Sequence, residues 1–199
     1  MNGGGEDRVE VSDAAALIAG GLPPRPPGAP PALWADLGAG GGTFTAALAR
    51  LLGAGSTVVA VERDPHAAAA LRGRAGAGGA AVVVRELDFT DAAAWDALGL
   101  DPLHGILLAN ALHFVPPGAQ GALLARLAGA LAPRGRLLVV EYEGRAPSPW
   151  VPYPVSLARL QALAPDGLRA RTVGSRASTF GGTMYAAVLE RALPPEPEP

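Results

Sequence analysis

A glycine-rich segment that follows a short apolar run carries the strongest chemical signal in this sequence. Glycine occupies positions 38, 40 and 42, Asp36 precedes these glycines, and Thr43 opens a helical pattern directly after them. Glycine permits positive φ angles and lets a ligand approach the backbone closely. A helix that begins after such a turn offers unpaired N–H groups and roughly half a positive charge. We therefore expect this segment to bind a ligand carboxylate or phosphate, the alternative being a plain turn in a chain that contains 27 glycines.

The same segment distinguishes two classes of ligand. The dinucleotide pattern G-x-G-x-x-G, counted from Gly38, requires glycine at position 43, where this chain has threonine. The carboxylate of Asp36 would repel a pyrophosphate, because two like unit charges about 4 Å apart cost on the order of 4 kcal/mol at an effective dielectric constant of about 20. The same carboxylate suits a ligand with an ammonium or sulfonium group, and S-adenosylmethionine carries both.

Acidic side chains follow the next two apolar runs. Glu62 ends a β-branched run, and a carboxylate in that place can accept hydrogen bonds from ribose hydroxyl groups. The alternative for Glu62 is a surface partner for Arg63. Asp88 can accept a hydrogen bond from an adenine amino group and Phe89 can cover a ring face, whereas helix capping is an equal alternative for Asp91. These residues indicate a nucleoside ligand.

Candidate catalytic residues follow the fourth and fifth apolar runs. The carboxyl ends of strands form the ligand crevice in open α/β sheets, so we expect Asn110 beside a bound ligand. A histidine can take a proton from an acceptor, and His113 and Tyr142 are the two catalytic candidates. The alternative for His113 is a partly buried ring that backbone groups satisfy, and Glu141 and Glu143 are expected to face solvent. Cysteine is absent and no two histidines have ligand spacing, so no metal site is expected.

The elements that must position these residues alternate along the chain. Five apolar or β-branched runs are typical of buried strands, at residues 33–37, 57–61, 80–87, 103–109 and 136–142. Helical patterns lie between them: an apolar face of Phe44, Leu48, Leu51 and Leu52, a helix started by Asp64 and Pro65, a short helix at 90–98, and a face of Leu123, Leu124, Leu127 and Leu131 that stops at Pro133. This alternation predicts an α/β fold with a doubly wound, mostly parallel sheet covered on both faces.

Both ends of the chain depart from this alternation. Ser12 and Asp13 are expected to cap a short N-terminal helix. A helix is expected at 155–164, and the strands expected at 168–173 and 183–190 have no helix between them. These last two strands should therefore pair as an antiparallel hairpin.

Length and composition favour a single domain. The 199 residues suit one domain, which we expect at 12–192 with a Pro-rich connector at 22–31, while 1–11 and 193–199 are expected to be disordered. The formal net charge is −2 and there is no basic stripe, so no nucleic-acid partner is expected. Because the sequence shows no signal-peptide pattern and no run of 18 apolar residues, we expect a cytoplasmic protein without a membrane span.

Together, these motifs resemble those of the class I S-adenosylmethionine-dependent methyltransferases over about residues 33–190. The resemblance implies a seven-stranded sheet in the order 3-2-1-4-5-7-6, closed by the C-terminal hairpin, with S-adenosylmethionine as cofactor. It further implies contacts of Gly38, Ala39, Gly40 and Gly42 with the methionine part, Asp36 with its ammonium group, Glu62 with the ribose, Asp88 and Phe89 with the adenine, and Asn110 beside the sulfonium. We also expect Arg63, which follows Glu62 in the sequence, to contact the cofactor.

The resemblance predicts methyl transfer to a small molecule. Enzymes of this fold that methylate nucleic-acid amino groups carry Pro-Pro-Tyr or a similar sequence after the first residue of the fourth-strand motif, whereas Ala111 and Leu112 follow Asn110 here. Two alternatives remain at this stage. One is an NAD-dependent oxidoreductase of the Rossmann type, and the other is a catalytically silent module that binds a nucleoside.

Overall fold

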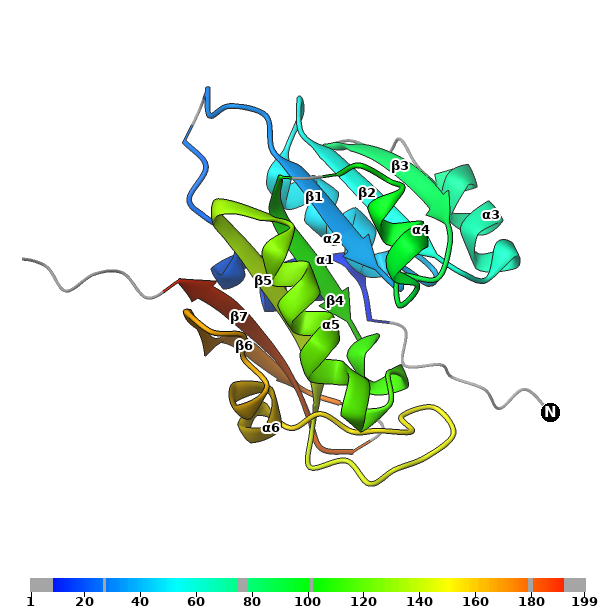
Figure 1. Ribbon diagram of the computed structural model, residues 1–199. Helices are drawn as coiled ribbons and strands as arrows, with labels where there is room; N and C mark the ends of the chain where they lie inside the picture. The colour runs from blue at the N-terminus through cyan, green and yellow to red at the C-terminus, as the bar shows by residue number, and fades with distance from the viewer. Residues whose placement is uncertain (1–8, 27, 75–78, 101, 179–180, 192–199) are drawn as a thin grey trace, which may run out of the picture.

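The computed structural model describes residues 9–26, 28–74, 79–100, 102–178 and 181–191. Its centre is a seven-stranded sheet in the order β3-β2-β1-β4-β5-β7-β6 (Figure 1), which confirms the expected order. The strands are β1 (Leu33–Leu37), β2 (Thr57–Glu62), β3 (Ala81–Glu86), β4 (Leu103–Ala109), β5 (Leu131–Glu143), β6 (Leu168–Ala177) and β7 (Thr183–Arg191). The first five are parallel, and β7 is antiparallel to both β5 and β6, as expected for a closing hairpin.

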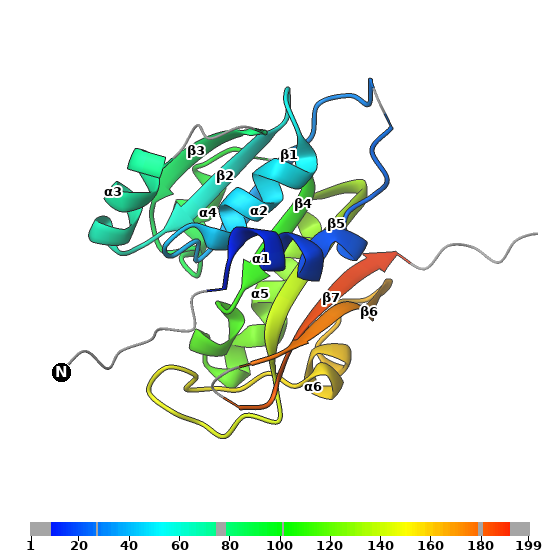
Figure 2. The same cartoon turned by 180° about the vertical axis from the view of Figure 1, so that it is seen from behind.

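Helices cover both faces of the sheet. They are α1 (Val11–Ile18), η1 (Ala19–Gly21), α2 (Thr43–Leu52), α3 (Pro65–Arg74), α4 (Ala92–Asp96), η2 (Leu112–Phe114), α5 (Pro117–Gly129) and α6 (Leu157–Ala162). Figure 1 shows α4 and α5 in front of the sheet, and Figure 2 shows α1 and α2 in front of the opposite face. Two apolar clusters result, one between the sheet and α4, α5 and α6, and the other between the sheet and α1 and α2.

The central strands are apolar throughout because both of their faces are covered. In β4, Leu103 and residues 106–108 are fully buried, and Trp34 of β1 is fully buried beside it. Trp34 pairs in register with Gly105, and a Cβ atom at position 105 would overlap the indole ring. Glycine at this position therefore makes room for the largest side chain in the centre of the sheet.

Aspartate side chains start two of the crossover helices as expected. Asp64 Oδ1 accepts a hydrogen bond from the backbone N–H of His66 in the first turn of α3. Asp91 Oδ1 accepts from the N–H groups of Ala93 and Ala94 in α4, so the capping alternative holds for Asp91. No helix in the described part of the chain is long and apolar enough to cross a membrane.

Two expectations about element ends are wrong. Helix α1 begins at Val11 after Glu10, so Ser12 and Asp13 lie inside it and do not cap it. The expectation that the helix extends to Leu131 is also wrong. Helix α5 ends at Gly129, and Leu131 belongs to β5, where it pairs with Leu103 of β4. Pairing with β4 determines the structure there, and a register shift before Gly105 accommodates the residues around Pro133 that were expected to end the helix.

The segments expected to be irregular fall partly outside the described residues. Residues 1–8 and 192–199 are not described, but Val9 is described and the helix at Val11 lies within the range 1–11 that was expected to be disordered. The described residues of the connector at 22–31 contain no helix or strand.

Candidate functional site

A cavity of about 660 Å³ opens where the carboxyl ends of β1, β2 and β4 meet. Cavities of roughly 300–1,000 Å³ hold small molecules and cofactors. The walls are formed by the turn after β1, the end of β2, the end of β4 and two apolar side chains: residues 38–44, residues 62–64, residues 109–111, Val9 and Phe114. The expected crevice at the strand ends is therefore present, and three of the four predicted motifs form its walls.

The glycine turn needs glycine for two different reasons. Gly38, Gly40 and Gly42 all have positive φ angles, of 74°, 51° and 83°. At Gly38 and Gly42 a Cβ atom would also overlap a neighbouring side chain, of Ala111 and Leu71 respectively. At Gly40 a Cβ atom would meet nothing closer than a carbonyl oxygen at 4.0 Å. The space above Gly40 therefore belongs to the cavity, and the N-terminus of α2 begins beside it.

Glu62 holds the glycine turn in place. Its Oε2 accepts a hydrogen bond of 2.8 Å from the N–H of Gly40, and its Oε1 accepts one of 2.9 Å from the N–H of Asp64. The side chain is buried against the cavity wall, with 9% exposed. Each carboxylate oxygen can accept a second hydrogen bond, so Glu62 still has capacity for ligand hydroxyl groups.

Asp36 lies behind the glycine turn and does not line the cavity. Its carboxyl group is 1% exposed and accepts a hydrogen bond of 2.6 Å from the hydroxyl group of Thr45 in α2. Along β1 it points to the same face as Trp34, which packs against α1 and α2, so the strand directs it toward α2. Burial, assisted by the charge of Glu62 and opposed by the Thr45 bond, raises the pKa of Asp36 to about 7. In this structure the Asp36 side chain braces α2, and its expected contact with a ligand ammonium group stays a prediction.

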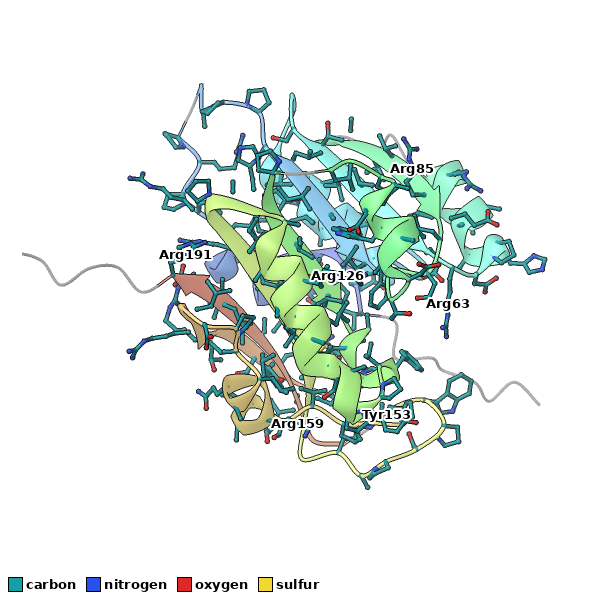
Figure 3. All side chains as sticks on the ribbon, viewed as in Figure 1. Arg63, Arg85, Arg126, Tyr153, Arg159 and Arg191 are labelled. Atoms are coloured by element: carbon teal, nitrogen blue, oxygen red, sulfur yellow. The ribbon has the colours of Figure 1, made fainter. Side chains whose placement is uncertain are left out.

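Asp88 and Phe89 reach the cavity only through their neighbours. Arg63 lines the cavity, and its Nη1 lies 3.3 Å from Asp88 Oδ2. Burial would raise the pKa of Asp88, but hydrogen bonds from Thr90 and Arg63 together hold it below its usual value. Phe89 packs behind the glycine turn against the cluster under α4 and α5. Figure 3 shows Arg63 on the outside of the molecule, below α3 and α4.

Asn110 has the backbone and the side chain of a ligand-binding residue. Its φ angle is 53°, and no other described residue except glycine has a positive φ angle. Its Oδ1 atom is buried at the cavity wall without a hydrogen-bond partner in the described part of the chain. A buried acceptor left unpaired costs about 1–3 kcal/mol, and strained backbone is retained mostly at functional sites. Both observations fit an acceptor that awaits a donor on a ligand.

The two catalytic candidates do not line the cavity. The imidazole of His113 is 2% exposed, and its Nδ1 lies 2.6 Å from Oε2 of Glu141. Glu141, expected to face solvent, is completely buried, because β5 is covered on both faces there. Tyr142 is half-buried, and the Cζ atom of Arg145 lies over its ring, 4.9 Å from the ring centre. The ring centres of Tyr142 and His113 are 6.2 Å apart. The catalytic roles of His113 and Tyr142 stay predictions.

Sequence reasoning missed several residues of the cavity wall. Phe44 and Phe114 each lie next to a motif residue, and a search for apolar neighbours of those motifs would find them. Phe114 is 48% exposed and lines the cavity. Val9 precedes α1 and carries no local signal, because only the packing of α1 against α2 brings it to the cavity.

Three solved structures with a similar fold are methyltransferases by name. Magnesium protoporphyrin IX methyltransferase from Synechocystis PCC 6803, with bound S-adenosylmethionine, is 22% identical; the match covers 91% of this chain and 77% of that chain, with a TM-score of 0.65. A Burkholderia thailandensis 1,6-didemethyltoxoflavin-N1-methyltransferase, with its substrate and S-adenosylhomocysteine bound, is 23% identical over 94% and 80% of the two chains, with a TM-score of 0.63. An arsenic(III) methyltransferase from Chlamydomonas reinhardtii is 16% identical over 92% and 74%, with a TM-score of 0.64.

At these identities the solved structures show the fold alone. No curated protein sequence matches the chain significantly. A family model described as a methyltransferase domain matches residues 35–135, which span the glycine turn, Glu62, Asp88 and Asn110. That match takes in more than half of the sequence, and the chain therefore belongs to the methyltransferase-domain family.

Proposed function

We propose that this protein transfers the methyl group of S-adenosylmethionine to a small-molecule acceptor. The observation that carries the proposal is the cavity between the glycine turn, Glu62 and Asn110, at the edge where the carboxyl ends of three parallel strands meet. A glycine turn at a helix N-terminus suits the carboxylate of the methionine part, and the acceptor oxygens of Glu62 suit ribose hydroxyl groups. The group bound there supplies a methyl carbon already activated by sulfur.

The residues proposed to hold the cofactor differ in how directly they act. Gly38, Ala39, Gly40 and Gly42 would contact the methionine part through backbone groups, and Asn110 would offer its unpaired Oδ1 to a donor such as the ammonium group. Asp36 would act indirectly, by fixing α2 through Thr45. Arg63 lines the cavity and fixes Asp88, so Asp88 and Phe89 would set the adenine end from behind the wall.

A small-molecule acceptor is favoured by the size and the chemistry of the cavity. A volume of about 660 Å³ suits the cofactor together with a small acceptor. Magnesium protoporphyrin IX and 1,6-didemethyltoxoflavin, named for two of the similar structures, are both small molecules. The chain's own contribution is to align the acceptor with the methyl group and to exclude water.

Calorimetric titration with S-adenosylhomocysteine tests the proposal. We expect saturable binding, and we expect Gly40→Val to reduce the affinity at least tenfold, because its side chain would enter the cavity above the turn. The matched control is Gly99→Val, since Gly99 has a similar φ of 58°, an open environment and a position outside the cavity. Absence of binding by the wild-type protein, or binding of NAD in its place, would reject the proposed cofactor.

A further inference from the structure

A buried carboxylate–imidazole pair lies directly behind one wall of the cavity. Both oxygens of Glu141 bond to His113: Oε1 accepts from its backbone N–H at 3.0 Å, and Oε2 lies 2.6 Å from its Nδ1. Glu141 is 0% exposed and His113 is 2% exposed. His113 is the middle residue of η2, and the residues around this turn, Ala111 and Phe114, form the cavity wall.

Fold stability alone is a weak reason for such a pair. Removing a carboxylate from water costs several kcal/mol, and replacing buried charged groups by apolar side chains is often neutral or stabilising. The neighbours of Glu141 on the same strand, Val139 and Val140, are apolar, so an apolar residue would suit this position as well. A catalytic site is a common place for a pair of this kind.

The geometry determines which ring nitrogen is available for chemistry. A proton on Nδ1 directed at Glu141 leaves the lone pair of Nε2 free to accept a proton. The ring centre of Phe114 lies 4.5 Å from that of His113, and Phe114 lines the cavity. The imidazole is therefore one side chain away from the cavity, and its contact with an acceptor requires Phe114, which is 48% exposed, to turn aside.

The turn that carries His113 is fixed on both sides. The carbonyl oxygen of His113 accepts a hydrogen bond of 3.0 Å from the N–H of Tyr153, which belongs to the loop between β5 and α6. Figure 3 shows Tyr153 on this loop, below α5. Gln120 of α5, fully buried, donates to the carbonyl oxygens of Leu112 and Val115 on either side of the turn. These bonds hold the imidazole in one place relative to the cavity.

We propose that His113 is the general base of the reaction and that Glu141 is its positioning residue. The proposal rests on the proposed methyl transfer and specifies its acceptor: a hydroxyl oxygen or an acidic C–H carbon, whose proton must leave as the new bond forms. A neutral amine attacks through its own lone pair and has less need of such a base.

The proposed step balances in atoms and charge. The acceptor atom forms a bond to the methyl carbon, the carbon–sulfur bond breaks with its electron pair remaining on sulfur, and the acceptor's proton passes to Nε2 of His113. The positive charge lost at sulfur reappears on the imidazole, 2.6 Å from the Glu141 carboxylate, and the proton later leaves to solvent. Glu141 thus acts by stabilising the protonated ring and fixing its orientation.

Four variants test the proposal: His113→Asn, Glu141→Gln, the conservative change Glu141→Asp and the control His66→Asn. His66 is exposed on α3 and its ring is outside the cavity wall. Binding of S-adenosylhomocysteine is measured first, and we expect the affinities of all four variants to stay within threefold of that of the wild type. Methyl transfer from S-adenosylmethionine is then measured with phenol, acetylacetone and benzylamine as probes.

The expected result is transfer to phenol or acetylacetone by the wild type. His113→Asn should lower kcat at least 100-fold and Glu141→Gln at least tenfold with little change in KM, and Glu141→Asp should recover part of the loss. An independent readout is the ¹⁵N spectrum of the imidazoles, of which the chain has 3. We expect His113 to hold its proton on Nδ1, and to lose this preference in Glu141→Gln.

Some results would contradict the roles of His113 and Glu141 and still be consistent with the proposed methyl transfer. Three results would reject the base and the acceptor class if the wild type still binds S-adenosylhomocysteine. They are methyl transfer to benzylamine alone, no transfer to any of the three probes, and an unchanged kcat in His113→Asn. A proton found on Nε2 of His113 in the wild type would reject the role of Glu141. Loss of product binding by the wild type would instead reject the cofactor assignment.

Discussion

Buried acidic side chains at this site do three different jobs, according to the partner each one meets. Asp36 meets the Thr45 hydroxyl group, Glu62 meets two backbone N–H groups, and Glu141 meets an imidazole and its backbone N–H. Hydrogen bonds to a carboxylate stabilise its charged form, and burial alone disfavours that form. Asp36 is buried and has one neutral hydrogen-bond partner, and burial raises the pKa of its carboxyl group to about 7.

Asp36 should make the fold less stable as the pH rises. Its pKa of about 7 in the folded protein exceeds the ordinary value of 3.8, so the folded state holds a proton that the unfolded chain releases between about pH 4 and pH 7. The free energy of unfolding should therefore fall over that range. Asparagine at this position does not titrate. We therefore expect the free energy of unfolding of Asp36→Asn to exceed that of the wild type by on the order of 2–4 kcal/mol at pH 8 and to equal it near pH 4. Urea unfolding at the two pH values measures the difference.

The same variant also locates Asp36 relative to the ligand. With Asp36 behind the glycine turn, the affinity of Asp36→Asn for S-adenosylhomocysteine should stay within threefold of the wild type. A tenfold loss of affinity would mean that the carboxylate contacts the ligand ammonium group after all. Equal pH dependence of unfolding in the two proteins would contradict the raised pKa.

At the scale of elements, η2 depends on a hydrogen-bonded connection from α5 and α6. Gln120 donates to Val115 at 3.0 Å, and Arg159 Nε donates to Gln120 Oε1 at 2.9 Å. Gln120→Met keeps the size of the side chain and leaves these partners unpaired, so we expect a loss of about 1–3 kcal/mol in the free energy of unfolding. Gln161→Met, at an exposed position of α6, is the control and should change it by less than about 0.5 kcal/mol. Urea denaturation compares them, and equal losses in both variants would contradict the role of Gln120.

The elements that could be predicted from sequence are those whose local pattern has one solution. The expected limits of β1 and β4 match the structure because strands buried on both faces are short continuous apolar runs. Leu131 fits the spacing of α5 and also that of a strand, and only pairing with Leu103 of β4 decides between them. The end of α5 therefore could not be found from the local sequence.

Site residues follow the same division. Gly40, Glu62 and Asn110 could be predicted to lie at the cavity because each lies at the carboxyl end of a strand or in the turn directly after one. The direction of Asp36 and the burial of Glu141 depend on what packs over β1 and β5. Those contacts come from α2, 9 residues from Asp36, and from η2, 28 residues from Glu141, and the residue pattern of each strand alone does not encode them.

At the scale of the whole molecule, the contact between β1 and β4 joins the two halves of the sheet and the two sides of the cavity. β1 leads to the glycine turn and β4 leads to Asn110, so their register sets the distance across the site. Gly105 and Trp34 lie at this contact, and no atom can be added to Gly105 unless the indole ring moves. Packing here therefore affects both stability and the shape of the site.

Gly105→Ala should destabilise the whole fold, by about 1–3 kcal/mol or more, because the added methyl group overlaps a fully buried indole ring in a tightly packed layer. Gly118→Ala is the control, since Gly118 lies in α5 with open space around it and alanine favours helix there. The partner change Trp34→Phe removes the atoms that the methyl group would meet, so the double variant should be less destabilised than the sum of the single changes. A double-mutant cycle by urea unfolding measures this coupling. Additive losses would show that Gly105 is required for a reason other than its contact with Trp34.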